Sequence, residues 1–321
     1  MRNDYKITSR NIYLLLITVT IFWGTSYVAA KLGMRDLLPL NLAILRFVIA
    51  SLLFSVILFL EKGSHCIDRK DIPQFFLLGF WAITVFYYIH FTGLQFTTST
   101  NAGLIMATTP AFATLFCWLT KKEKVNSHNL LGIGTAFIGV LLVISQGQGG
   151  DLFYQKTFFG NSLIILNALI WAWFTLKGKT VLKKYRPFLA MAYIHIFGTI
   201  ILLPFAFFPT ILVETTLWQQ LPQISLTTLG AAIYLGIFCS VYSYFIWYLA
   251  ISKIGALKTA VFNYFNPVMA TLAGILFFGD KLTGYIVCGG MLVIAGVYIT
   301  NQNNPPAPAN KIYLPVRAVS R

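Results

Sequence analysis

Long apolar stretches, separated by short polar segments, fill most of the sequence. A helix needs roughly 20 predominantly apolar residues to cross about 30 Å of hydrocarbon, and ten stretches have about that length. They lie near residues 11–31, 39–60, 72–93, 99–119, 128–145, 159–179, 188–212, 226–249, 257–278 and 283–301. The pattern predicts an all-α integral membrane protein with ten transmembrane helices.

Part of this pattern occurs twice, because residues 79–139 recur without a gap at residues 236–296. The residues that return, identical or similar, 157 positions later are Gly79, Pro110, Ala113, Thr114, Glu123, Lys124, Gly132 and Gly139. A shift of 148 aligns Trp23, Lys31 and Pro39 with Trp171, Lys179 and Pro187. The nine extra residues fit the polar stretch 214–225. We therefore predict two repeats of five helices, residues 1–148 and 149–303, and a flexible cytoplasmic tail, 304–321.

Basic residues are distributed unevenly between the loops. When loops are assigned alternately to two sides, the side with both termini holds 19 of the 24 lysines and arginines, the other side holds four, and Arg46 lies within a span. The positive-inside rule then places both termini in the cytoplasm. Because five is an odd number, the second repeat must enter the membrane inverted. Inverted repeats place a binding site at their interface near the membrane midplane, and rocking of the halves exposes it to each side in turn.

Composition narrows the class of protein further. With 57% hydrophobic residues, 10% charged residues and a mean hydropathy of +0.74, the chain needs lipid around it. The net charge of +15 therefore indicates contact with anionic lipid headgroups, and we expect no nucleic-acid partner. The sequence has no GxSxG, HExxH or GxxxxGK[ST] motif, and its four cysteines have no metal-ligand spacing. We expect neither an enzyme nor a nucleotide-driven pump, and no metal or cofactor.

Several segments resemble a known family. They are FWGTSYVAAK (22–31), LRFVIA (45–50), NAGLIMATTPAFATLF (101–116), LGIF with the aromatic-rich run after it (235–248), and FNPVMATLAGILFFGDKL (265–282). Together they are similar to the EamA-type branch of the drug/metabolite transporter superfamily, across all ten predicted helices. The resemblance implies a ten-helix inverted-repeat carrier of small metabolites, often an exporter of amino acids. Two positions depart from the pattern: Asp280 replaces the usual glutamate, and Ile194 stands at the position matched with Arg46.

Two matched prolines mark candidate binding and hinge positions. Pro110 and Pro267 lie inside predicted helices, where proline removes a backbone hydrogen bond and frees the carbonyl four residues earlier, on Met106 and Asn263. Polar side chains stand beside them: Thr108, Thr109 and Asn266. These groups suit an ammonium or amide group of a substrate. The alternative is a pair of kinks whose freed groups bond to neighbouring helices.

Aromatic residues and one arginine are further candidates for a substrate cavity. Trp23 matches Trp171 and Tyr87 matches Tyr244, and each ring face could hold a cation by about 0.5–2 kcal/mol. Interfacial belts and core packing are the alternative. Arg46 should point inward, because a charge facing lipid is costly. Its partner could be a substrate carboxylate, helix-terminal carbonyls or a structural network, or it could snorkel.

Charged and titratable residues suggest gates and energy coupling. Lys31 with Asp280 on the outer side, and Lys179 with Glu123 on the inner side, could form gate latches or could be ordinary charged helix ends. No acidic residue lies within a predicted span, so the candidates for proton coupling near neutral pH are His90 and His195. Both could equally be packing residues, and facilitated diffusion stays open.

These inferences predict a secondary transporter in the cytoplasmic (inner) membrane that exports amino acids or related small polar metabolites by alternating access. The alternatives are an importer of a small metabolite and a lipid-handling or scaffold membrane protein. Gly132 with Gly139, and Gly289 with Gly296, stand seven residues apart. They allow close helix packing within the fold or against another protomer, so the sequence is compatible with a monomer or a homodimer.

Overall fold

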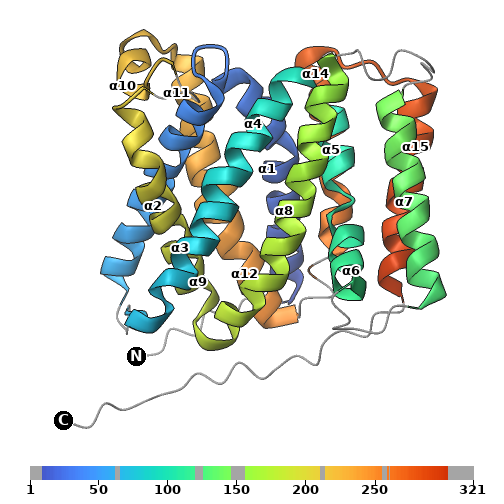
Figure 1. Ribbon diagram of the computed structural model, residues 1–321, viewed down its shortest axis with the longest axis horizontal. Coiled ribbons are helices and arrows are strands. Elements are labelled where there is room, and N and C mark those ends of the chain that lie inside the picture. The colour runs from blue at the N-terminus through green and yellow to red at the C-terminus, as the bar shows by residue number, and fades with distance from the viewer. Residues whose placement is uncertain are drawn as a thin grey trace.

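The computed structural model describes residues 9–61, 66–119, 126–145, 156–209, 214–254, 259 and 261–302. Within these ranges the chain is helical and contains no strand, which confirms the all-α prediction. The helices run side by side in one bundle (Figure 1). Among the described residues, the helical segments long and apolar enough to cross a membrane are seven: Asn11–Gly33, Pro39–Leu60, Arg69–Phe96, Ser127–Ser145, Thr157–Gly178, Pro187–Ala206 and Leu226–Trp247.

In the first half of the chain, every predicted span contains a helix. The α-helices are α1 (Ser9–Gly33), α2 (Pro39–Leu60), α3 (Ile72–Gly79), α4 (Phe86–Phe96), α5 (Ser99–Met106), α6 (Thr109–Leu119) and α7 (Ser127–Ser145). A 3-10 turn, η1 (Arg69–Asp71), precedes α3, and a π-helical segment, η2 (Phe80–Val85), joins α3 to α4. The fourth predicted span is therefore divided between α5 and α6.

The second half repeats this order. Its α-helices are α8 (Lys156–Lys184), α9 (Pro187–Leu202), α10 (Leu217–Gln220), α11 (Leu226–Tyr234), α12 (Ser243–Ile254), α14 (Asn266–Phe278) and α15 (Gly284–Gln302). The 3-10 segments are η4 (Leu203–Ala206), η5 (Leu221–Gln223) and η7 (Val261–Phe265), and η6 (Leu235–Tyr242) is π-helical. The ninth predicted span is thus η7 followed by α14.

Proline fixes where several helices begin. Pro39 and Pro187, which the sequence shift of 148 matches, occupy the first turns of α2 and α9, where the missing N–H would be unpaired in any case. Pro110 and Pro267 occupy the first turns of α6 and α14. Neither proline therefore lies in the interior of an α-helix. Pro110 follows a two-residue turn after α5, and Pro267 follows the 3-10 segment η7, so each stands in the first turn of an α-helix, where its missing N–H is tolerated.

Residues that the two sequence shifts match also contact each other in space. Ser51 of α2 and Thr199 of α9, which are 148 positions apart, share a hydrogen bond of 2.7 Å. A Cβ placed on Gly79 would lie 2.9 Å from a carbonyl oxygen of α9, and one placed on Gly236 would lie 3.0 Å from the Arg46 carbonyl oxygen of α2. Reciprocal contacts of this kind are expected for two copies related by a twofold axis. They support the proposed duplication.

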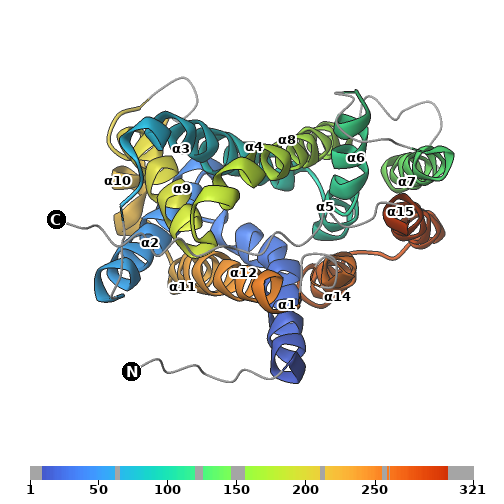
Figure 2. The same ribbon diagram turned by 90° about the horizontal axis from the view of Figure 1, so that it is seen from below.

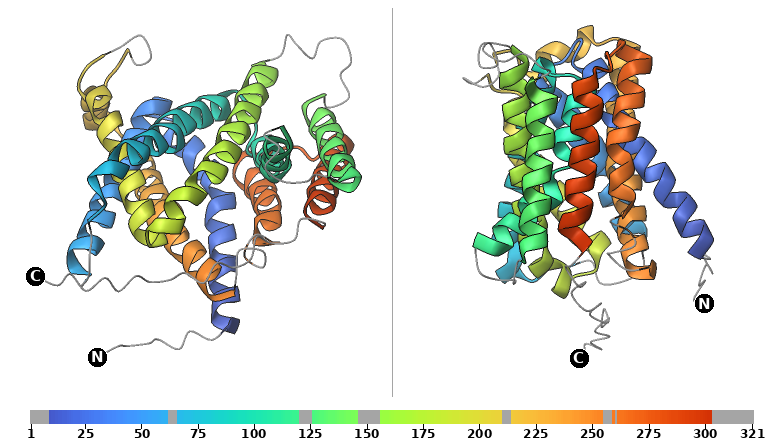
Figure 3. Two further views of the ribbon diagram at one scale, coloured as in Figure 1. Left: turned by 60° about the horizontal axis from the view of Figure 1, so that its bottom comes forward. Right: turned by 90° about the vertical axis from the view of Figure 1, so that its right-hand side faces the viewer.

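Helices α7 and α15 pack against each other at one edge of the bundle (Figures 2 and 3). A Cβ on Gly139 would lie 2.6 Å from the Gly289 carbonyl oxygen, and a Cβ on Gly296 would lie 2.6 Å from that of Gly132. Only glycine allows the backbones to approach so closely. The glycines singled out in the sequence therefore serve packing within the fold.

The two ends of the bundle are named here by one residue each. The Asp36 end holds the end of α1, the start of α5 and α10, whereas the Lys184 end holds the end of α8 (Figure 1). The first residue of α1 and the last residue of α15 both lie at the Lys184 end (Figures 1 and 3).

Candidate functional site

Arg46 lies near the middle of α2 and is 3% exposed, as expected for a charge that avoids lipid. Its Nε–H donates to Oγ of Ser240 at 3.0 Å, and a terminal N–H donates to the hydroxyl of Tyr87 at 3.3 Å. The guanidinium carbon is 4.4 Å from the centre of the Tyr87 ring. Among the described residues Arg46 forms no ion pair. Its charge is thus held inside the bundle by neutral partners.

Ser240 is a partner that the sequence did not reveal. It lies in η6, where the backbone is π-helical, and its hydroxyl also donates to the Leu235 carbonyl five residues earlier. The equivalent stretch of the first half, η2, is π-helical too. A π-helical turn shifts the side chains that follow it relative to an α-helix, and such turns are frequent at functional sites. The residue of the first repeat that matches Ser240 is the apolar Ile83. Comparing the two repeats therefore gave no indication that Ser240 belongs to the site.

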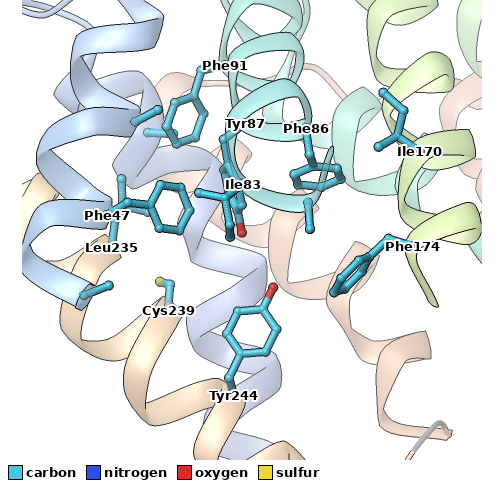
Figure 4. Close-up of a cluster of buried hydrophobic side chains, with 14 of the residues drawn as sticks. Phe47, Ile83, Phe86, Tyr87, Phe91, Ile170, Phe174, Leu235, Cys239 and Tyr244 are labelled. Carbon is cyan, nitrogen blue, oxygen red and sulfur yellow. The ribbon is translucent and has the colours of Figure 1, made fainter. Parts of the chain in front are cut away.

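The predicted aromatic residues gather around this arginine. Tyr244 of α12 lies with its ring centre 5.6 Å from Trp23 of α1 and 6.4 Å from Trp171 of α8. The indole N–H of Trp23 donates to the Cys239 carbonyl at 3.0 Å. Figure 4 shows the hydroxyl groups of Tyr87 and Tyr244 pointing toward each other from opposite sides. The structure therefore brings Trp23, Arg46, Tyr87, Trp171 and Tyr244 into one neighbourhood.

The two histidines line the same neighbourhood. The amide nitrogen of Asn167 donates to Nδ1 of His90 at 2.9 Å and lies 3.8 Å from Sδ of Met106. Nδ1–H of His195 donates to the Met191 carbonyl at 2.8 Å, and Nε2 is buried without a hydrogen-bond partner. Asn167 is a second residue that sequence reasoning missed. The sequence pattern places Asn167 on an apolar face of its helix. Only the packing of α8 against α4 shows that it bonds to His90.

The groups around Pro110 are less available than expected. The Thr109 hydroxyl donates to the Met106 carbonyl at 2.7 Å, and the Thr108 hydroxyl donates to the Ile105 carbonyl at 2.6 Å. The prediction that the Met106 carbonyl is unpaired is therefore wrong. Threonine supplies the bond locally because its hydroxyl reaches back to a carbonyl three or four residues earlier.

Around Pro267 one polar atom stays without a partner. The amide nitrogen of Asn266 donates to the side-chain oxygen of Asn263 at 3.3 Å. The side-chain oxygen of Asn266 is buried and has no hydrogen-bond partner among the residues that the structure describes. Both asparagines are partly buried. They remain candidate substrate contacts near the start of α14.

The candidate gate residues at the Asp36 end do not pair with each other. Oδ2 of Asp280 accepts hydrogen bonds from Thr100 of α5, at 3.2 Å from its backbone N–H and 2.9 Å from its hydroxyl. The Lys31 ammonium lies 5.6 Å from the centre of the Phe278 ring, and no ion pair within 4.0 Å joins it to Asp280. Glu123 and the side chain of Lys179 lie outside the described residues. The latch role stays a prediction.

Asp36 carries a hydrogen-bonded cluster at its end of the bundle. Its Oδ2 accepts from the N–H and the hydroxyl of Ser225, at 2.9 and 2.6 Å, and from the hydroxyl of Thr228 at 2.6 Å. These bonds, with that of the Ser225 hydroxyl foremost, lower the pKa of Asp36 to about 2. They tie the loop between α1 and α2 to the start of α11.

Lys184 forms an analogous cluster at the other end. Its ammonium lies 2.5 Å from Oδ2 of Asp68 and 2.5 Å from Oδ2 of Asp71. The bonds to Asp68 and Asp71 raise the pKa of Lys184 above its ordinary value. The Tyr185 hydroxyl also donates to Asp71. The end of α8 is thereby tied to the start of α3.

A bundle of apolar helices that surrounds a buried arginine and a ring of aromatic side chains defines a multi-pass membrane protein with a polar site in its interior. A family model described as the EamA-like transporter family matches residues 10–145 and again residues 158–302. The chain belongs to this family. It is therefore a member of a transporter family rather than of an enzyme family.

Curated relatives of this chain are named as transporters or efflux pumps. An uncharacterized transporter of Archaeoglobus fulgidus is 32% identical over 288 residues, which cover 90% of this chain and 96% of the relative. A probable amino-acid metabolite efflux pump of Escherichia coli is 26% identical over 296 residues, which cover 91% of this chain and 95% of the relative. A crystal structure aligns with a TM-score of 0.61 at 16% identity, covering 92% of this chain and 97% of that one. This last likeness shows the fold alone.

Proposed function

We propose that this transporter exports amino acids or related small polar metabolites across the cytoplasmic membrane by alternating access. The observation that carries the proposal is the buried Arg46, whose charge is held among neutral and aromatic side chains rather than in an ion pair. Inward-facing ionisable groups in membrane helices typically mark the path of a substrate. The printed name of the Escherichia coli relative, a probable amino-acid metabolite efflux pump, supports export.

Two inverted repeats, residues 1–148 and 149–303, supply the moving parts in this proposal, with both termini in the cytoplasm. The family model matches the chain twice, at residues 10–145 and 158–302, and matched residues meet across α2 and α9. The Lys184 end then faces the cytoplasm. Rocking of one repeat against the other would expose the site around Arg46 to each side in turn.

The helix breaks at Pro110 and Pro267 serve as hinges in this mechanism. Pro110 lies just after the turn between α5 and α6, and Pro267 lies just after the change from the 3-10 segment η7 to α14, and proline removes one backbone hydrogen bond at each place. Near the Asp36 end, α14 packs against α5, where a Cβ on Gly103 would lie 2.5 Å from that of Ala270. The Asp280–Thr100 bonds join the same two helices. Opening toward the outside would separate α5 from α14.

The test is counterflow uptake by the purified protein in liposomes. Labelled amino acids, amines and organic acids are offered with and without a proton gradient, and protein-free liposomes are the control. We expect saturable exchange of amino acids or closely related solutes. A response to the proton gradient would show coupling, and its persistence in a His90→Gln, His195→Gln double variant would exclude the two histidines as its carriers. If protein shown to be folded exchanges none of these solutes, the proposal is wrong, and a lipid-handling or scaffold role takes its place.

A further inference from the structure

We propose that Arg46 binds the carboxylate of the transported solute, so that the substrates are carboxylates with an apolar or aromatic remainder. The inference rests on the proposed transport function and names its substrate class. It also makes a restriction that the proposed function does not make. An amine or amide of the same shape, lacking the carboxylate, is not a substrate.

The first argument is the charge balance of the interior. All nine acidic residues of the sequence lie outside the interiors of the described helices, in loops, at helix ends or beyond the described residues. Arg46 is nevertheless 3% exposed. An unpaired charge in a site of low dielectric constant is costly, and an anion that enters beside it removes much of that cost. The anion has to come from outside the described helices, and a bound solute supplies it.

The second argument is the geometry of the guanidinium. A guanidinium has five N–H donors in a rigid fork, and two of the hydrogen bonds of Arg46 are those to Ser240 and Tyr87. The guanidinium carbon also lies 4.4 Å from the centre of the Tyr87 ring. Such a fork matches the two oxygens of a carboxylate better than it matches a single carbonyl or hydroxyl oxygen. Ser240 and Tyr87 therefore act as positioning residues for Arg46.

The third argument concerns the surroundings. Trp23 and Trp171 are partly buried, and both lie against the ring of Tyr244. The Trp23 indole is held by its bond to the Cys239 carbonyl, so its ring face is presented in a fixed orientation. Aromatic walls favour an apolar or aromatic group in the solute. None of the nine acidic residues is available inside a described helix to hold an ammonium as a counter-ion.

The competing explanation is that Arg46 only joins α2, α4 and η6 through its two hydrogen bonds. The two roles give different results with matched solutes. A structural arginine affects all solutes alike, because its loss disturbs the site as a whole. A carboxylate-binding arginine affects only those solutes that carry the carboxylate.

The experiment uses the full-length protein in liposomes and three probes that share one aromatic group. They are phenylalanine, 3-phenylpropionate, which lacks the amino group, and phenylalaninamide, which lacks the carboxylate. Each competes for counterflow of whichever labelled solute the wild type exchanges. We expect the two carboxylates to inhibit at concentrations within about tenfold of each other. Phenylalaninamide should need at least about tenfold more, since a charge-assisted bidentate contact is lost.

Substitution of the arginine then separates the two roles. In Arg46→Gln we expect the carboxylates to lose at least about tenfold in apparent affinity while phenylalaninamide changes little. Arg46→Lys keeps the charge without the fork and should retain a reduced preference for carboxylates. It also keeps the test usable if Arg46→Gln does not fold. Ser240→Ala keeps the guanidinium and should weaken the preference less than Arg46→Gln.

Several outcomes would overturn the inference. In the wild type, inhibition by phenylalaninamide at the same concentration as phenylalanine would do so without any variant. An equal loss for all three probes in a folded Arg46→Gln protein would assign a structural role instead. Either result leaves the transport function standing. Absence of exchange for every solute would overturn the transport proposal and this inference together.

Discussion

Asp36 and Lys184 occupy positions that the shift of 148 matches, and their partners are matched as well. Ser225 and Thr228, which donate to Asp36, stand 157 positions after Asp68 and Asp71, which accept from Lys184. The same contact thus occurs at both ends of the bundle with the charges exchanged. A carboxylate faces hydroxyl groups at one end, and an ammonium faces carboxylates at the other.

The Asp36 cluster predicts a loss of stability in acid. Hydrogen bonds from Ser225 and Thr228 lower the pKa of Asp36 from 3.8 to about 2, so the unfolded chain binds more protons than the folded protein between roughly pH 4 and pH 2. The contribution of this carboxylate is complete above about pH 4 and is lost as the pH falls through 2. In detergent, the thermal unfolding midpoint of the wild type should fall across this range more than that of Asp36→Asn.

The comparison needs a second carboxylate at the same end of the molecule as a control. Glu214 is exposed, and Glu214→Gln should keep the wild-type dependence on pH. If the unfolding midpoints of Asp36→Asn and the wild type fall equally in acid, the Asp36 carboxylate does not contribute to the pH dependence of stability.

At the scale of single residues, the sequence predicted which side chains belong to the site better than it predicted their hydrogen-bond partners. Arg46 was expected to point inward, because a charge that faces lipid is costly, and it is buried rather than snorkelling. The sequence could not show that Ser240 bonds to Arg46 or that Asn167 bonds to His90. Neither Ser240 nor Asn167 has a polar residue at its matched position in the other repeat. The sequence also could not show whether a backbone carbonyl near a proline is free to accept a hydrogen bond from a substrate. That depends on the rotamer of a neighbouring threonine such as Thr109.

At the scale of helices, two π-helical segments begin beside a glycine that contacts a neighbouring helix. Gly79 precedes η2 and lies against α9, while Gly236 lies within η6 against α2. Apolar periodicity cannot reveal a π-helical turn, since the residues remain apolar on all faces. The repeat, however, places the two turns at matched positions. A π-helical turn that occurs at matched positions in both halves belongs to the fold itself and is not a local irregularity.

The close pair formed by α7 and α15 gives a prediction about stability. Gly139→Ala places a methyl group 2.6 Å from the Gly289 carbonyl oxygen, so the helices must separate, at a cost of about 1–3 kcal/mol. The thermal unfolding midpoint in detergent should fall.

Gly134 provides the matched control for this experiment. It lies on the same helix, and a Cβ there would meet nothing within 4 Å. Gly134→Ala should leave the midpoint unchanged or raise it slightly, because alanine favours the helix over glycine. Equal destabilisation by both substitutions would mean that the close approach of α15 at Gly139 does not explain the effect.

At the scale of the whole molecule, the proposed orientation can be tested with a native cysteine. Cys66 is exposed and lies just before η1, at the Lys184 end that we place in the cytoplasm. A maleimide that cannot cross the membrane should label it in inside-out vesicles but not in intact spheroplasts. Cys239 is buried and should not react.

Cys66→Ser identifies the signal from this position, because Cys288 is also exposed. The difference between wild type and Cys66→Ser should appear only in inside-out vesicles. Labelling of Cys66 in intact spheroplasts would reverse the orientation that the basic loops predict.

The sequence predicted the helical segments well because their length and apolarity are fixed by the membrane. The equivalence of residues between the two repeats comes from the ungapped sequence match and stays a prediction, which the contact between Ser51 and Thr199 supports. The sequence did not predict how α5 and α6 divide one span, because the effect of Pro110 depends on whether a helix continues or restarts at that residue.

The hydrogen bond between Ser51 and Thr199 has a consequence for the history of the chain. If both halves descend from one sequence, these two positions were once the same residue in two separate molecules, meeting across an axis of symmetry. The ancestral protein would then have been a homodimer whose subunits inserted in opposite directions. Fusion of the two genes would then have let the halves diverge, so that one half now carries Arg46 where the other carries Ile194.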